Sequence, residues 1–140
     1  MCGIAGFSGT VKDPSISLSA MIKTISHRGP DDRGLWFDDN TQIGLAHSRL
    51  SILDLSSAGH QPMHSKSGRY VIVFNGEIYN YKQILRELEV VSTIKMEGHS
   101  DTEVLLASIE KWGLEKTLRK TSGMFALALW DREKNILSLA

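Results

Sequence analysis

The hydrophobic and polar positions of the chain follow two kinds of pattern, one typical of strands and one typical of helices. Strand-like stretches bounded by turn residues occupy residues 2–8, 33–38, 41–47, 49–54, 70–74, 124–131 and 136–140. The run at 70–74 is continuously β-branched or aromatic, which predicts a central strand buried on both faces. Asn75-Gly76 follows it directly, and these residues suit unusual backbone angles, so we expect the strand to end there.

Apolar residues recur at helical spacing in three stretches between the strands. Asp13-Pro14 combines an N-cap with a first-turn proline, and its helix is expected to stop at residues 27–30. Asn80 is expected to cap a second helix that reaches about residue 90. Residues 100–103 match the capping box of a third helix, which ends at Gly113. The predicted inward-facing residues are Leu18, Met21, Ile22, Ile25, Ile84, Leu85, Leu88, Val104, Leu105, Ile109 and Trp112.

Strands therefore come in clusters with helices between them, and residues 56–68 are expected to form a loop. This order is not a regular strand–helix alternation, so it favours an α+β fold with largely antiparallel sheets covered by helices. The stretch 136–140 has strand character without a terminating turn. It indicates either a domain truncated within a longer protein or a natural final strand.

Composition narrows the class of protein. The 140 residues are expected to form one domain, residues 1–140, and sixteen basic and sixteen acidic side chains cancel to a net charge of zero. Without a polybasic block, nucleic acid and anionic membranes are poor candidates as partners. One cysteine allows no internal disulfide, and neither a signal peptide nor a span of about 20 apolar residues is present. We expect a cytoplasmic protein.

Cys2, the single cysteine, is the first candidate for chemistry. Removal of Met1 would leave a thiol and a free α-amine on one residue, and such an amine has an ordinary pKa of about 8. The amine could accept the proton of the thiol, so nucleophile and base would come from the same residue. The simpler interpretation of a lone cysteine is a small buried hydrophobic residue.

Three further positions offer groups that would suit an amide substrate. The carboxamide of Asn75 and the backbone N–H of Gly76 could stabilise an oxyanion, although Asn-Gly is also a common turn. Arg49 could pair with a carboxylate, although its position is also typical of a surface arginine at the start of a strand. Asp101 could receive an ammonium group, although its place at a helix start explains it as a capping residue.

The histidines and glycines give no sign of a metal or a nucleotide. His60 and His64 are four residues apart, but Pro62 between them argues against one helix presenting both. No phosphate-binding loop of the GxxxxGK type is present, and no GxGxxG segment follows a strand. We therefore expect no metal and no cofactor in this domain.

Taken together, several motifs resemble one family: the glutaminase domain of glutamine-hydrolysing asparagine synthetases. This domain is a class II glutamine amidotransferase with an N-terminal nucleophile. The motifs are MCGIAG at 1–6, HRGPD at 27–31, RLSILD at 49–54, QP at 61–62, NGEIYN at 75–80 and SDTE at 100–103. They follow the order found in the family and extend over nearly the whole chain.

The resemblance implies a four-layered αββα sandwich of the N-terminal-nucleophile hydrolases. It implies that Cys2 attacks the side-chain amide of glutamine while Asn75 and Gly76 hold the oxyanion. Arg49 would bind the α-carboxylate of the substrate and Asp101 its α-amine. The residues expected to shape the pocket are Leu50, Ile52, Leu53 and Glu77. Ammonia and a thioester would form, and water would then release glutamate.

The family domain continues with an Arg-Asp-containing segment and further strands, followed by an ATP-using synthetase domain. This chain contains neither, so we expect an incomplete domain whose open sheet edge could support a homodimer. L-glutamine and the C-terminal synthetase domain are the expected partners, with ATP and Mg confined to the synthetase domain. Two other hypotheses about the function stay open: a non-catalytic, truncated or degenerate glutamine-binding module, and an amidase for a different amide. The final acceptor of the ammonia is also open.

Overall fold

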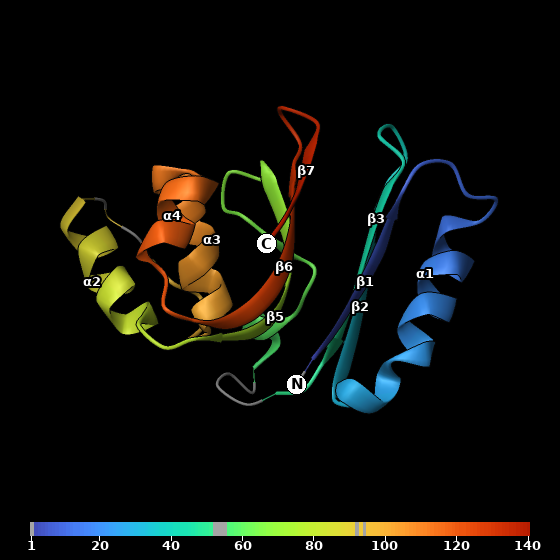
Figure 1. The fold of residues 1–140 in the computed structure, drawn as a ribbon, viewed down its shortest axis with the longest axis horizontal. Helices are drawn as coiled ribbons and strands as arrows, with labels where there is room; N and C mark the ends of the chain where they lie inside the picture. The colour runs from blue at the N-terminus through green and yellow to red at the C-terminus, as the bar shows by residue number, and fades with distance from the viewer. Residues whose placement is uncertain (1, 52–55, 92, 94) are drawn as a thin grey trace.

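A computed structural model describes residues 2–51, 56–91, 93 and 95–140. Two antiparallel sheets lie face to face, and a helical layer covers the outer face of each (Figure 1). The first sheet has the order β1-β3-β2, with β1 (Gly3–Ser8), β2 (Asp32–Asp38) and β3 (Ile43–Arg49). The second has the order β4-β5-β6-β7, with β4 (Met63–His64), β5 (Tyr70–Ile78), β6 (Gly123–Asp131) and β7 (Ile136–Leu139). The αββα arrangement expected from the resemblance is confirmed.

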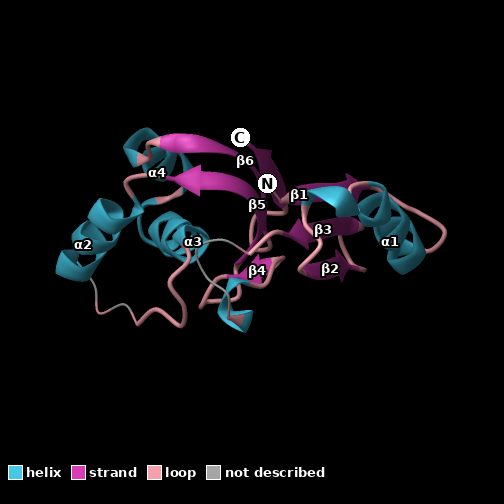
Figure 2. Ribbon diagram, turned by 90° about the horizontal axis from the view of Figure 1, so that it is seen from below, coloured by secondary structure: helices cyan, strands magenta, loops and turns pink. Residues whose placement is uncertain are grey.

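The helices are divided unequally between the two outer faces. Helix α1 (Pro14–Thr24) covers the first sheet, and α2 (Tyr81–Val91), α3 (Asp101–Trp112) and α4 (Leu114–Lys120) lie on the side of the second sheet (Figure 2). Short 3₁₀ turns, η1 (Ser26–Arg28) and η2 (Ser57–Gly59), lie in the connections. The sequence pattern predicted the first three helices but not α4, which follows Gly113 without a side-chain cap.

Strand β5 is buried on both faces, as its apolar run predicted. Val71 and Val73 belong to the core between the sheets, whereas Tyr70, Ile72 and Phe74 belong to the core under the helices. Strand side chains alternate between the two faces of a sheet, so this run supplies both cores at once. A third, smaller core joins α1 to the first sheet.

The structure corrects several local expectations. Strand β5 does not end at Asn75-Gly76 but continues to Ile78, because both residues pair with β6. The strand expected at 49–54 is not found: Arg49 ends β3, residues 50 and 51 lie outside any strand, and 52–55 fall outside the described residues. Residues 56–68 contain η2 and the short strand β4 besides loop.

Two side chains differ from their predicted roles. Met21 is more than one-third exposed, so it does not belong to the buried face of α1. Asn80 precedes α2, but its side chain donates to the carbonyl of Lys120 and accepts from the backbone N–H of Ser122. It therefore joins the start of α2 to the end of α4.

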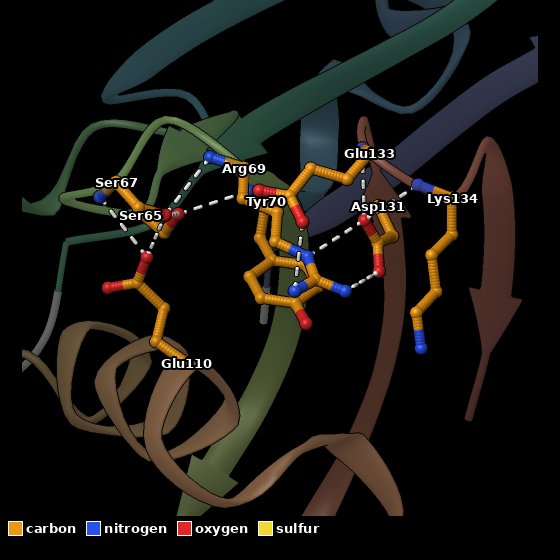
Figure 3. A network of polar contacts seen from close by, with 8 residues as sticks. All are labelled: Ser65, Ser67, Arg69, Tyr70, Glu110, Asp131, Glu133 and Lys134. Carbon is orange, nitrogen blue, oxygen red and sulfur yellow. Dashed lines mark hydrogen bonds and ion pairs between the residues drawn. The ribbon is translucent and has the colours of Figure 1, made fainter.

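A polar network closes the end of the second sheet where β5 begins and β6 ends (Figure 3). Arg69 donates two hydrogen bonds to Asp131, through Nε at 3.0 Å and Nη2 at 2.7 Å, and its guanidinium lies over the Tyr70 ring. Glu110 of α3 accepts from the backbone N–H and the hydroxyl of Ser67. These contacts tie the loop before β5 to β6 and α3.

Candidate active site

The candidate site is a cavity of about 210 Å³ at one end of the space between the sheets. Its walls come from the residue before β1, from β3, β5 and β6, from the connection after β3 that includes η2, and from the start of α3. The lining residues are Cys2, His47, Arg49, Leu50, Gly59, Gln61, Phe74, Asn75, Gly76, Glu77, Ser100, Asp101, Thr102 and Met124. Seven of the nine predicted site residues are therefore brought together, and Ile52 and Leu53 lie outside the described residues.

Strand alternation explains why polar residues line this end of the sandwich. On β3, Ile43 and Leu45 fill the core between the sheets, and the next residue on that face, His47, lines the cavity. On β5, Val71 and Val73 fill the same core, and Asn75 follows them into the lining. The face is continuous, but its side chains change from apolar to polar at the cavity.

Cys2 lies directly before β1, where contacts from two segments hold it. The backbone N–H of Leu50 donates to its Sγ at 3.3 Å, and the Sγ lies 3.6 Å from the carbonyl oxygen of Leu50. The Nε of Arg28 donates to the Cys2 carbonyl oxygen at 3.0 Å. The sulfur is thus fixed between the N–H and the C=O of one residue, at the wall of the cavity.

The HRGPD segment supports both Cys2 and the residues after β3. Besides the contact of Arg28 with Cys2, the Asp31 carboxylate accepts from the backbone N–H of Ser51 at 2.7 Å. A Cβ on Gly29 would lie 2.3 Å from the carbonyl oxygen of Ser48, so only glycine allows this close approach. The segment therefore fixes Cys2 and the Leu50 backbone relative to each other.

Arg49 lies at the end of β3 with only 8% of its surface exposed. Its Nη1 donates to the carbonyl oxygen of Ser56 at 2.8 Å. A Cβ on Gly59 would lie 2.1 Å from its Nη2, so the glycine leaves room for the guanidinium. The side chain is thus held in the cavity wall, which makes it a suitable partner for a carboxylate.

One edge of β5 faces the cavity beyond the point where β4 ends. Strand β4 pairs only with Val71 and Ile72. Beyond that pairing, Gln61 accepts from the Phe74 N–H at 2.6 Å and Asp101 accepts from the Ile78 N–H at 2.8 Å. Backbone groups two residues apart point the same way, so the Gly76 N–H lies on this edge between them.

Gly76 also has a local steric requirement. Its φ is +153°, and a Cβ there would lie 2.3 Å from the Met124 carbonyl oxygen and 2.5 Å from the Phe125 Cα. No side chain can be accommodated without moving β6. The sequence motif therefore needs glycine for close packing of two strands as well as for any chemistry.

Asp101 is the first residue of α3, after the N-cap Ser100. Burial raises the pKa of Asp101 above its ordinary value, and the nearby Glu77 adds to this effect. Hydrogen bonds from backbone N–H groups, including that of Ile78, act in the opposite direction. A buried carboxylate of this kind gains from a cationic partner, which the cavity could admit.

His47 is 1% exposed, and its Nε2 lies 3.1 Å from the carbonyl oxygen of Phe74. Burial lowers the pKa of His47 to about 4, so the ring is neutral at physiological pH. Among the described residues, neither its Nδ1 nor the Oδ1 of Asn75 has a hydrogen-bond partner.

Sequence reasoning did not select His47, Gln61, Thr102, Gly59 or Met124. The alternation on β3 could have indicated His47, because it shares a face with Arg49. Gln61 and Thr102 lie within the QP and SDTE motifs, but no local pattern marks them as site residues, since their contacts join segments 41 residues apart. Met124 is 64% exposed, so it resembles an ordinary surface residue.

Two further observations concern the described residues as a whole. No helix among them is long and apolar enough to cross a membrane. They also contain no group of three or more His, Cys, Asp or Glu side chains arranged to hold a metal ion.

Comparison with known proteins establishes the class that this fold and cavity suggest. The chain belongs to the glutamine amidotransferase domain family, which it matches over residues 1–140. It is a class II domain, homologous to the N-terminal glutaminase domains of asparagine synthetases. The family predicted from the sequence motifs is thus confirmed.

The similar curated proteins are much longer than this chain. It is 38% identical to amidase chry2 of Gibberella zeae, with 100% of the chain and 22% of that protein aligned. It is 37% identical to asparagine synthetase [glutamine-hydrolyzing] 3 of Bacillus subtilis, covering 100% of the chain and 23% of the relative. The putative asparagine synthetase 2 of Methanocaldococcus jannaschii is 37% identical, covering 98% and 29%. The chain thus spans about a quarter of the length of these relatives.

A solved structure supports the fold. Glutamine phosphoribosylpyrophosphate amidotransferase from B. subtilis, complexed with ADP and GMP, superposes with a TM-score of 0.72. The match covers 92% of this chain and 35% of that one, at 19% sequence identity. At this identity the likeness concerns the fold alone.

Proposed function

We propose that this chain hydrolyses glutamine to glutamate and ammonia, with Cys2 as the nucleophile. The proposal rests on one observation: a thiol, a carboxamide, an arginine and a buried carboxylate line the same cavity. These groups come from residues 2, 49, 75 and 101, which are far apart in the sequence. Together they match the reactive amide and both α-charges of a free amino acid.

In the proposed first step, the Cys2 Sγ attacks the side-chain carbonyl carbon of glutamine, and its proton passes to the Cys2 α-amine. The resulting oxyanion is held by the Asn75 carboxamide and the Gly76 N–H. Collapse breaks the C–N bond, and the α-ammonium returns the proton to the departing nitrogen, which leaves as ammonia. Water, deprotonated by the same amine, then cleaves the thioester and releases glutamate and the free thiol. This scheme requires the removal of Met1.

Substrate selection follows from the charges at the rest of the cavity. Arg49 would bind the α-carboxylate of glutamine through charge-assisted hydrogen bonds. Asp101 would bind the α-ammonium, with Glu77 beside it. The backbone around Leu50, extending to Ile52 and Leu53, would complete the pocket. A peptide-bound glutamine lacks both α-charges, so the free amino acid should be preferred.

The destination of the ammonia is part of the proposal. The relatives named asparagine synthetase are several times longer than this chain. We infer that the ammonia serves an ATP-dependent, asparagine synthetase-type module in the whole protein, which would be cytoplasmic. ATP and Mg would belong to that module, and the glutaminase step would use no cofactor.

Mass spectrometry with a diazoketone analogue of glutamine tests the site directly. The analogue alkylates nucleophiles that accept glutamine, so the expected result is loss of the Met1 mass and one adduct on Cys2. Ammonia release from glutamine should accompany it, and amides without both α-charges should react far more slowly. Loss of Met1 with neither adduct nor ammonia would overturn the proposal and favour a non-catalytic glutamine-binding module.

A related amidase makes a second substrate class worth testing. Amidase chry2 is 38% identical to the chain, and its name specifies an amidase. Parallel assays with glutamine, asparagine and simple primary amides at equal concentration separate the two. Faster turnover of a simple amide that lacks the amino-acid charges than of glutamine would favour a general amidase.

A further inference from the structure

The backbone of Phe74 is held in a way that ordinary strand pairing does not provide. On β5, the N–H and C=O of Phe74 point away from β6, toward the side where β4 has already ended. Both groups are buried, so each needs a partner. Two side chains supply these partners in place of a neighbouring strand.

Gln61 provides the acceptor. Its Oε1 receives the Phe74 N–H at 2.6 Å, and its Nε2 lies 3.4 Å from the Thr102 Oγ1. The side chain is 6% exposed and lines the cavity. It therefore connects β5 to the first turn of α3, where Asp101 lies.

His47 provides the donor. A carbonyl oxygen can only accept, so the contact at 3.1 Å places the ring proton on Nε2. The Nδ1 is then a bare acceptor, and it has no partner among the described residues. The hydrogen bond of His47 is thus directed at the peptide group that links Phe74 to Asn75.

We propose that Gln61 and His47 are positioning residues: Gln61 holds the Phe74 N–H, His47 holds the Phe74–Asn75 peptide, and together they aim Asn75 and the Gly76 N–H into the cavity. This inference rests on the proposed glutaminase function and extends it. Rotation of that peptide would move the Asn75 carboxamide, and a displacement of about 1 Å from the productive geometry can cost about 100-fold in rate. Neither residue needs to contact the substrate.

Kinetics separate this role from a merely structural one. His47→Leu and Gln61→Met should each lower kcat for glutamine by about 10- to 100-fold, with KM nearly unchanged. His47→Gln, which can still donate an N–H, should recover most of the rate. In an Asn75→Ala background the His47→Leu change should lower kcat by clearly less than it does in the wild type, because part of its effect acts through Asn75.

Ser108→Ala is the matched control, because it removes a buried side-chain donor to a backbone carbonyl, that of Leu105 within α3, and Ser108 does not line the cavity. It should leave kcat unchanged. Full additivity of His47→Leu with Asn75→Ala would overturn the proposal, as would equal losses in the control.

A structural measurement keeps the inference testable without turnover. In the 140-residue chain, ¹⁵N NMR of the imidazole should show the His47 proton on Nε2. Gln61→Met should speed hydrogen exchange of the Phe74 amide by about tenfold or more. A proton on Nδ1, or unchanged exchange, would contradict the positioning role even if the chain hydrolyses glutamine. If both measurements give the expected result while glutamine is not hydrolysed, His47 and Gln61 hold the Phe74 backbone as proposed, and only the proposed function fails.

Discussion

The two ends of the β5–β6 ribbon are both polar, but their polar groups are used differently. At the Tyr70 end, charged groups find partners within the protein (Figure 3). The hydrogen bonds of Arg69 lower the pKa of Asp131, and hydrogen bonds from Ser67 and Ser65 outweigh burial to lower that of Glu110. Both carboxylates are thus stabilised in their ionised form.

At the Ile78 end, the balance is reversed. Burial raises the pKa of Asp101, and the Oδ1 of Asn75 has no partner among the described residues. Asp101 is held by backbone N–H groups, which do not neutralise its charge. Mutually satisfied polar residues stabilise a fold, whereas positioned but uncompensated ones are typical of sites that await a ligand.

Replacing the proposed nucleophile, at the cavity end of the ribbon, should have the largest effect on the turnover of glutamine. Cys2→Ala removes the only thiol, so kcat for glutamine should fall by about 10⁴-fold or more, to background. Calorimetry should still detect glutamine binding, because Arg49 and Asp101 remain. Turnover clearly above background in the variant would exclude Cys2 as the nucleophile.

Removing a proposed oxyanion donor should have the second-largest effect on turnover. Asn75→Ala is expected to lower kcat by about 100- to 1000-fold, because the carboxamide would stabilise charge that develops only in the transition state. KM should change little, which steady-state kinetics can establish. A wild-type rate in this variant would show that the uncompensated carboxamide has another role.

Asp101→Asn tests the buried charge with little change in shape. The amide oxygen can still accept from Ile78, but the negative charge is lost. We expect kcat/KM to fall by about 10- to 100-fold, mainly through KM, because a charged hydrogen bond is worth about 1.5–3 kcal/mol. Glutamine titrations across pH provide the check, and an unchanged KM would remove Asp101 from substrate binding.

The pH dependence follows from the direction of the shift. Because the pKa of Asp101 is raised in the folded state, its contribution to stability is present at low pH and is lost as pH rises through that pKa. Substrate affinity has the opposite dependence, since protonation removes the charge that attracts the ammonium. Falling pH should therefore raise KM earlier than an ordinary aspartate would, and Asp101→Asn should abolish this effect.

The sequence predicted the core more completely than the site. The alternation that buries Val73 between the sheets is local and was predicted correctly, as was Ser100 as the N-cap of α3. The capping box itself is only half formed, because the Glu103 carboxylate accepts from Glu97 and Gly98. The extension of β5 through Gly76 was not predicted, because pairing with β6 overrides the weak strand preference of Asn-Gly. Gln61 acts through long-range contacts, which no local pattern encodes.

The smallest effect on turnover is expected at the opposite end of the ribbon. Asp131→Asn weakens the pairing with Arg69 about five residues of strand, or roughly 17 Å, from Asn75. The glutamine kcat should stay within about twofold of wild type, while the midpoint of thermal unfolding at neutral pH falls by a few degrees. Because the pKa of Asp131 is lowered on folding, its stabilisation is lost as pH falls through that pKa, so the difference between variant and wild type should shrink in acid. Thermal melts at several pH values, read beside kcat, decide the matter: a fall in kcat with unchanged melting would mean that this network also serves the cavity.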